Sequence, residues 1–175
     1  MRKLDKDFYI KQADVLAPAL LGKILVRRRE DGTRARGRIT ETECYLGEED
    51  TACHAGRGRG KTERTQIMYR KGGVAYVYLC YGIHNMLNVV SGQEGSPQAV
   101  LIRGINYGDK NLAGPGRLTK HMGIDRNFNG TDLCGDTLWI EDDDCGTPEY
   151  TATPRIGIDY AAEEDRNRLW RFVLK

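Results

Sequence analysis

One short segment carries side chains that could do acid–base chemistry. The run "ITETECYLG", residues 39–47, holds two glutamates separated by one residue and followed by a tyrosine. In extended backbone alternate side chains point to opposite faces, so Glu41, Glu43 and Tyr45 would share one face and Cys44 would lie on the other. A carboxylate inside a strand is costly to bury, so this face is either wet or keeps one glutamate for a purpose.

A histidine in the following loop raises the question of a metal site. His54 lies near four possible ligands, which are Cys53, Glu48, Glu49 and Asp50. Their spacing matches no zinc or calcium pattern, so we expect a pocket or structural histidine, with no metal and no organic cofactor. The chain has five cysteines, an odd number, and none of them form a C-x-x-C pair. We therefore expect a reducing, intracellular setting.

A second candidate region is rich in aromatic residues. In "AYVYLCYGIHNMLN", Tyr76 and Tyr78 would share one face of a strand, and Tyr81 precedes Gly82 at a tight turn. A large ring at a turn is covered either by the protein core or by a nucleic-acid groove, where side chains can wedge between base steps. Asn88, an amide among apolar residues, either pins the fold or discriminates between the edges of a ligand.

The charge is unevenly distributed along the chain. Residues 1–88 contain 17 basic and 11 acidic residues, whereas residues 89–175 contain 10 basic and 14 acidic ones. Two basic clusters, at 27–38 and 57–71, account for most of this difference. Such a distribution suits a partner that carries phosphates. Arginines and lysines that decorate solvated strand edges would give the same pattern, so charge alone leaves both readings open.

The elements that must position these groups are mostly strands. "KILVRRR" and "TRARGRITETECY" read as a hairpin joined at Asp31-Gly32, and the aromatic segment reads as a second hairpin. Further strands are predicted for "QAVLIRGI", "DTLWIE", "RIGI" and "RLWRFVL". "ADVLAPALLG" predicts a helix capped by Asp14 with Pro18 in or near its first turn, and "GPGRLTKHMGI" predicts one that ends at Gly123.

Strands that outnumber segregated helices indicate the α+β class. We expect a single domain over residues 1–175, with a largely antiparallel curved β-sheet, peripheral helices and a β-hairpin that protrudes toward DNA. No apolar run reaches the roughly 18 residues that span a membrane. The N-terminal segment lacks the apolar core of a secretion signal, so we expect a cytoplasmic protein, associated with the nucleoid if bacterial.

The order of these motifs resembles the alkyladenine (3-methyladenine) DNA glycosylase family. "TECYLG", the loop histidine, the aromatic hairpin, "VLIRG" and "GPGRL" occur in the family's order over most of the chain. The resemblance implies that Glu43 activates the attacking water, that Arg103 helps to hold it and that the backbone carbonyl of Ile156 completes the water site. It also implies a base-binding pocket made of four residues, Tyr45, His54, Tyr78 and Asn88.

The same resemblance implies how DNA is held. Tyr81 would fill the space that a flipped base leaves in the minor groove, and the basic residues Arg59, Arg64 and Arg117 would contact DNA. Two departures stand out. Cys44 replaces an alanine, on the face opposite Glu43, and "RGINYGDKNL" replaces "RALEP" after the pocket arginine, which could reshape DNA contacts or substrate choice.

Together these features predict a monomeric base-excision-repair glycosylase that acts on double-stranded DNA with damaged purines. It would flip out 3-methyladenine, 7-methylguanine, hypoxanthine or ethenoadenine and hydrolyse the N-glycosidic bond, which leaves an abasic site. No lysine lies in the pocket segments to act as a Schiff-base nucleophile, so strand cleavage is not expected. Two alternatives stay open: a glycoside hydrolase that uses Glu41 and Glu43 as paired carboxylates, and a non-catalytic minor-groove binding module.

Overall fold

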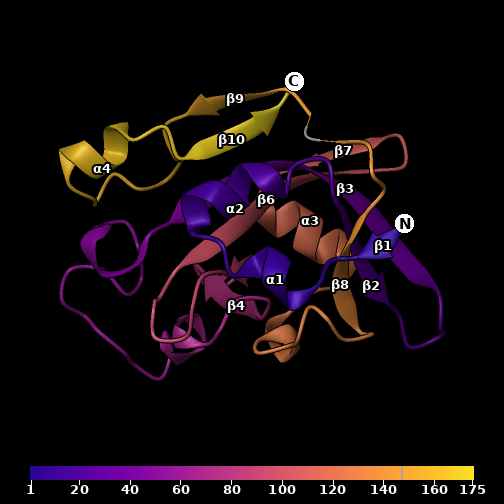
Figure 1. Ribbon diagram of the computed structural model, residues 1–175, viewed down its shortest axis with the longest axis horizontal. Helices are drawn as coiled ribbons and strands as arrows, with labels where there is room; N and C mark the ends of the chain where they lie inside the picture. The colour runs from indigo at the N-terminus through magenta and orange to yellow at the C-terminus, as the bar shows by residue number, and fades with distance from the viewer. Residues whose placement is uncertain (147) are drawn as a thin grey trace.

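A curled antiparallel sheet forms the centre of the molecule (Figure 1). The computed structural model describes residues 1–146 and 148–175. Within these ranges ten strands form one sheet, in which every strand pairing is antiparallel. The main path runs through β1 (Arg2–Lys3), β8 (Leu138–Asp142), β2 (Ile24–Arg28), β3 (Arg34–Tyr45), β6 (Ala99–Tyr107), β5 (His84–Val90) and β4 (Ala75–Cys80).

Three further strands extend this path. β7 (Lys110–Ala113) pairs with β6, and β10 (Arg171–Leu174) pairs with both β3 and β9 (Tyr150–Thr153). β9 and β10 lie side by side next to the C-terminus in Figure 1. The departure "RGINYGDKNL" thus spans the second half of β6, the turn and most of β7, and its effect on DNA contacts stays a prediction.

Four short α-helices accompany the sheet in the described part of the chain. They are α1 (Lys6–Tyr9), α2 (Ala13–Ala19), α3 (Pro115–Met122) and α4 (Glu163–Asn167). α2 packs on β3 and β6, and α3 packs on β5 and β6. The expected α+β class, with one domain and a largely antiparallel sheet, is confirmed. None of the helices described is long and apolar enough to cross a membrane.

Local sequence signals explain the first hairpin and the helix α3. Gly32 adopts a φ of 81°, and the carboxylate of Asp31 accepts hydrogen bonds from the backbone N–H and hydroxyl of Thr33, which fixes the turn between β2 and β3. Pro115 opens α3, where a missing N–H costs nothing, and Gly123 ends it in the left-handed conformation. Both predictions are confirmed.

The predicted cap of α2 is wrong. The helix begins at Ala13, so Asp14 lies inside its first turn and Pro18 lies in its second. The reason is a contact from far along the chain, because the side-chain oxygen of Gln98 accepts the free N–H of Ala13 at 2.9 Å. A distant amide therefore satisfies one of the unpaired N–H groups in the first turn of the helix.

The predicted strand "RIGI", residues 155–158, is also wrong. The strand lies just before it, at β9, and residues 155–158 form an irregular segment. The backbone N–H of Ile156 donates to Glu43, and the side chain of Arg155 turns inward to Asp50. These contacts hold the segment against the end of β3 instead of in the ladder between β9 and β10.

β3 positions the candidate chemistry because it is paired on both edges. Glu43 lies opposite Leu101 of β6 on one side and opposite Arg171 of β10 on the other. The expected alternation of faces is confirmed. The hydroxyl of Thr42 donates to the carbonyl of Ala17 in α2, and Cys44 lies in the main apolar core. On the opposite face Tyr45 donates to Glu43, and Arg103 contacts both Glu41 and Glu43.

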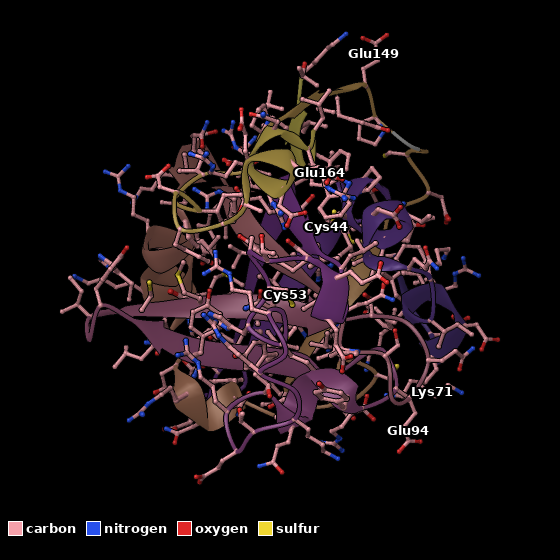
Figure 2. The ribbon with its side chains drawn as sticks, turned by 90° about the vertical axis from the view of Figure 1, so that its left-hand side faces the viewer. Cys44, Cys53, Lys71, Glu94, Glu149 and Glu164 are labelled. Carbon is pink, nitrogen blue, oxygen red and sulfur yellow. The ribbon has the colours of Figure 1, made fainter. Side chains whose placement is uncertain are left out.

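Side chains confirm which parts of the sheet are interior. Cys44 and Cys53 are buried, and Figure 2 shows them toward the middle of the molecule, with Lys71, Glu94 and Glu149 at its outer edge. Cys44 therefore contributes to core packing, as its place on the strand predicts.

Candidate active site

The Glu43 side chain is fully buried and held by three donors. Its Oε1 accepts the backbone N–H of Ile156 at 2.8 Å. Its Oε2 accepts the hydroxyl of Tyr45 at 2.8 Å and Nη1 of Arg103 at 3.4 Å. β3, β6 and the segment after β9 thus converge on one carboxylate.

Burial controls the protonation of this carboxylate. Removal from water raises the pKa of Glu43 above its ordinary value, although Arg103, the Ile156 N–H and the Tyr45 hydroxyl all act to lower it. Burial also raises the pKa of Tyr45 well above its usual range, so its hydroxyl stays a donor. A carboxylate offers about four lone pairs, so the three bonds leave one of them, on Oε1, for a further donor.

A pocket of about 420 Å³ lies in front of this carboxylate. Tyr45, Arg103 and Ile156 line it, and each of the three also contacts Glu43, so the carboxylate lies directly behind the pocket wall. The wall also contains the other predicted pocket residues, His54, Tyr78 and Asn88, and two of the predicted DNA contacts, Arg64 and Tyr81.

Aromatic rings form one side of the pocket. The rings of His54 and Tyr78 meet edge to face with centroids 4.5 Å apart, and Tyr76 lies 5.3 Å from Tyr78. Nδ1 of His54 is 2.9 Å from the hydroxyl of Tyr76. Burial, with a smaller effect of Arg64, lowers the pKa of His54 to about 4, so the imidazole is neutral at pH 7.

Asn88 is a rigid part of the wall. Its side-chain Nδ2 donates to the carbonyls of Tyr76 at 3.2 Å and Met86 at 3.3 Å, and the residue is buried. Both contacts are to its own hairpin, so the fold pins the amide and also aims it at the pocket. The two readings of this residue are therefore compatible.

Tyr81, at the tip of the second hairpin, has its ring exposed to solvent. Tyr81 is 89% exposed and has a φ of +50°, and Gly82 beside it has a φ of +74°. The left-handed conformation costs a residue with a Cβ about 1–2 kcal/mol. A strained, exposed tyrosine between two strands, with the exposed Ile83 next to it, is consistent with a contact surface. That this hairpin faces DNA stays a prediction.

The predicted basic contacts fall in different places. Nη2 of Arg64 is 3.5 Å from Nε2 of His54, and its guanidinium lies 5.0 Å from the ring centre of Tyr78, at the pocket itself. Arg59 lies in the exposed part of the basic loop, and Arg117 lies exposed in the first turn of α3, two residues after Pro115, which lines the pocket.

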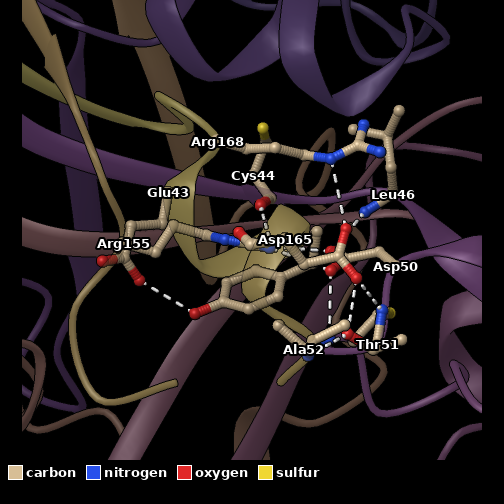
Figure 3. A network of polar contacts seen from close by, with 12 residues as sticks. Glu43, Cys44, Leu46, Asp50, Thr51, Ala52, Arg155, Asp165 and Arg168 are labelled. Carbon is tan, nitrogen blue, oxygen red and sulfur yellow. Dashed lines mark hydrogen bonds and ion pairs between the residues drawn. The ribbon is translucent and has the colours of Figure 1, made fainter. Parts of the chain in front are cut away.

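The site predicted from the sequence does not include a buried ion pair that the structure places behind the pocket. Asp50 and Arg155, whose side chains are both fully buried, form two hydrogen bonds of 2.6 and 2.9 Å (Figure 3). The guanidinium also donates to the carbonyl of Cys44 and lies between the rings of Tyr45 and Trp170, at 4.8 and 4.9 Å. The partners are 105 residues apart, so no local pattern predicts the pair.

The same network joins the loop that follows β3 to the segment between Arg155 and Asp165. Asp50 accepts the backbone N–H groups of Leu46 and Ala52, and the carboxylate of Asp165 accepts the N–H of Thr51 at 2.9 Å. Asp50 is thus committed to structural bonds. In the described ranges, no group of three or more His, Cys, Asp or Glu side chains is arranged to hold a metal ion.

A buried carboxylate with one free lone pair, behind an aromatic pocket, suits an enzyme that activates a small molecule beside a flat ligand. Residues 7–175 match the model of the methylpurine-DNA glycosylase (MPG) family. The chain therefore belongs to this family of DNA glycosylases, enzymes whose activity is consistent with base excision repair.

Full-length relatives support this assignment. A protein of Clostridium novyi (strain NT) named "Putative 3-methyladenine DNA glycosylase" is 41% identical over 198 aligned residues, which cover 100% of this chain and 96% of the relative. Proteins with the same name from Borreliella burgdorferi (strain ZS7) and Clostridium botulinum (strain Hall) are each 42% identical, and cover 98% and 99% of this chain and 96% of each relative.

Proposed function

We propose that the protein, over its whole length, is a monofunctional 3-methyladenine DNA glycosylase that acts as a monomer inside the cell. It takes double-stranded DNA with a damaged purine, turns that nucleotide out of the helix and hydrolyses its N-glycosidic bond. The observation that carries this proposal is the buried Glu43 carboxylate, 2.8 Å from the hydroxyl of Tyr45 at the back of an aromatic pocket.

Stacking supplies the binding energy for the flipped base. Tyr45, His54 and Tyr78 all line the pocket and offer ring surfaces to a planar purine. Each stacked contact contributes about 1–3 kcal/mol, enough to offset the few kcal/mol lost when a base is unstacked and unpaired. The pinned amide of Asn88 presents a wall that collides with the exocyclic amino group of normal guanine.

The proposed chemical step is a hydrolysis that one carboxylate can assist. Water donates a proton to the free lone pair on Oε1 of Glu43, its oxygen bonds to C1′ of the deoxyribose, and the C1′–N bond electrons leave with the purine. The negative charge of Glu43 stabilises the oxocarbenium character of the sugar. Arg103 and the backbone carbonyl of Ile156 hold the water, and the Ile156 N–H fixes the carboxylate.

The pocket favours purines whose leaving ability is already high. An N3- or N7-alkylated purine carries positive charge, so its bond to the sugar breaks without a donated proton. Neutral hypoxanthine needs a donor, and the neutral imidazole of His54 is a poor acid at pH 7. We therefore propose alkylated purines as the main substrates, with hypoxanthine and ethenoadenine released more slowly.

The two alternative readings are weaker. A glycoside hydrolase with paired carboxylates needs Glu41 to face the substrate, but Oε1 of Glu41 already accepts hydrogen bonds from Arg103 and Arg171, and Glu41 does not line the pocket. A binding module without chemistry has no use for a carboxylate held by three donors behind the pocket.

The decisive experiment measures base release from duplexes that each carry one of the four lesions, for the wild type and for Glu43→Gln. We expect the variant to bind lesion DNA and to release base about 10²–10⁴-fold more slowly. Glu141→Gln is the matched control, because Glu141 is also buried but lies in β8 and bonds to Trp139. Release at the wild-type rate by Glu43→Gln, or strand cleavage by the wild type, would contradict the proposal.

A further inference from the structure

The second glutamate of β3 is bound to two arginines at a single oxygen. Oε1 of Glu41 accepts Nε of Arg103 at 2.9 Å and Nε of Arg171 at 2.6 Å. Arg103 comes from β6 and Arg171 from β10, so the two strands that flank β3 both send a cation to this carboxylate. Glu41 is 8% exposed, so solvent screens these contacts little.

The backbone is shaped to allow this contact. The register between β3 and β6 is irregular on both sides of Glu41, and Gly104, which follows Arg103, lies opposite it. A Cβ on Gly104 would stand 2.9 Å from Oγ1 of Thr40 and 3.2 Å from Cβ of Glu41. Only a glycine therefore lets β6 approach closely enough for Arg103 to reach Glu41 from the neighbouring position.

The result is a row of four alternating charges that ends at the proposed base. Arg171 binds Glu41, Glu41 binds Arg103, and Arg103 contacts Glu43. The contacts are unequal, because the bond from Arg103 to Glu41 is 2.9 Å long and its contact with Glu43 is 3.4 Å long. Glu41 thus draws the guanidinium away from Glu43.

We infer that Glu41 and Arg171 are positioning residues that set how tightly Arg103 holds the Glu43 carboxylate. This inference rests on the proposed function for its catalytic meaning. Without Glu41, Arg103 would pair more closely with Glu43 and make it a weaker base. Without Arg171, Glu41 would draw Arg103 further away, and one positive charge near Glu43 would be lost.

Other groups also face Glu43 and stay unchanged in the test. They are the Tyr45 hydroxyl from the same strand, the Ile156 N–H from the segment after β9, and the Arg155 guanidinium behind the Tyr45 ring. Because these groups are common to every variant, a difference between variants reports on the Arg171–Glu41–Arg103 row.

The test is the titration of Glu43 in protein labelled with ¹³C at glutamate carboxyls, followed by NMR and assigned with Glu43→Gln. Glu41→Gln should lower the pKa of Glu43 and Arg171→Gln should raise it, each by about half a unit or more. The charge-matched controls are Glu149→Gln and Lys175→Gln, which remove an exposed ion pair at the same sheet edge and should leave the titration unchanged.

The rate of base release is measured for the same variants as a function of pH. The acid limb of the pH–rate profile should move down in Glu41→Gln and up in Arg171→Gln, and the Glu41→Gln plateau should fall about three- to tenfold. A structural role would lower rates without moving the limbs in opposite directions. The Arg171 side chain is 23% exposed against 11% for Glu41, so we expect its variant to fold even if Glu41→Gln does not.

The possible outcomes separate the two proposals. Unchanged titration, or shifts in the same direction, overturns the positioning inference whether or not base is released. Opposite titration shifts support it, and if the wild type then releases no base, the proposed function alone is wrong.

Discussion

The buried pair of Asp50 and Arg155 gives the sharpest prediction of stability. Asp50→Asn keeps the size of the side chain and one acceptor oxygen, but it removes the charge that balances Arg155. Both side chains are fully buried, and the carboxylate is bound through both oxygens. The variant therefore leaves a guanidinium in the interior with an amide group facing its donors.

The cost follows from the burial of the remaining charge. Breaking a buried ion pair by removing one partner costs about 3–5 kcal/mol, because the other charge is left uncompensated. Typical domains unfold with about 5–15 kcal/mol, so Asp50→Asn should lose a large part of the stability. Removing the cation as well, in Asp50→Asn with Arg155→Met, should cost less than the sum of the two single changes.

Urea unfolding at pH 7 measures this cost, with the slope of the transition compared between variants to show that the same unit unfolds. Asp136→Asn is the matched control, because it breaks an exposed pair with Lys3 and should leave the midpoint unchanged. A loss below about 1 kcal/mol in Asp50→Asn would mean that the pair is not the anchor of the two loops.

Two further predictions concern the hairpin tip and the pocket histidine. Tyr81→Gly removes a left-handed residue with a side chain, so its urea stability should stay equal or rise by about 1 kcal/mol, while its affinity for lesion duplexes in a gel-shift titration falls. Tyr150→Ala, at a partly exposed ring on β9, is the control, and unchanged lesion affinity in Tyr81→Gly would contradict the wedge. His54 has its pKa lowered to about 4, so the folded protein stays unprotonated where the unfolded chain binds a proton. Stability should therefore fall as the pH drops from about 6.5 toward 4, by on the order of 3 kcal/mol, and His54→Gln should lack this part of the slope in urea titrations. Equal slopes in the wild type and in His54→Gln would show that another group binds this proton.

Local periodicity accounts for what the sequence predicts well. The alternation of side chains along β3 puts Glu41, Glu43 and Tyr45 on one face regardless of what surrounds the strand, and the structure has this arrangement. The turns at Gly32 and Gly123 are also set by the residues that form them. These features need no knowledge of distant segments.

Long-range contacts decide the rest. The start of α2 depends on Gln98, and the irregular segment at 155–158 depends on contacts with Glu43 and Asp50. From the sequence, Glu41 is also a possible second catalytic carboxylate, because nothing in its own strand indicates that Arg103 and Arg171 bind it. Side chains separated by 62 to 130 residues leave no periodic signal.

The Asp50–Arg155 pair also joins two segments that contribute to the pocket lining. Asp50 lies four residues before His54, Arg155 lies directly before Ile156, and both His54 and Ile156 line the pocket. Neither of these two segments can move away from the other without exposing or separating two buried charges. The pair therefore fixes these two parts of the pocket lining relative to each other, through the electrostatic cost of separating two buried charges.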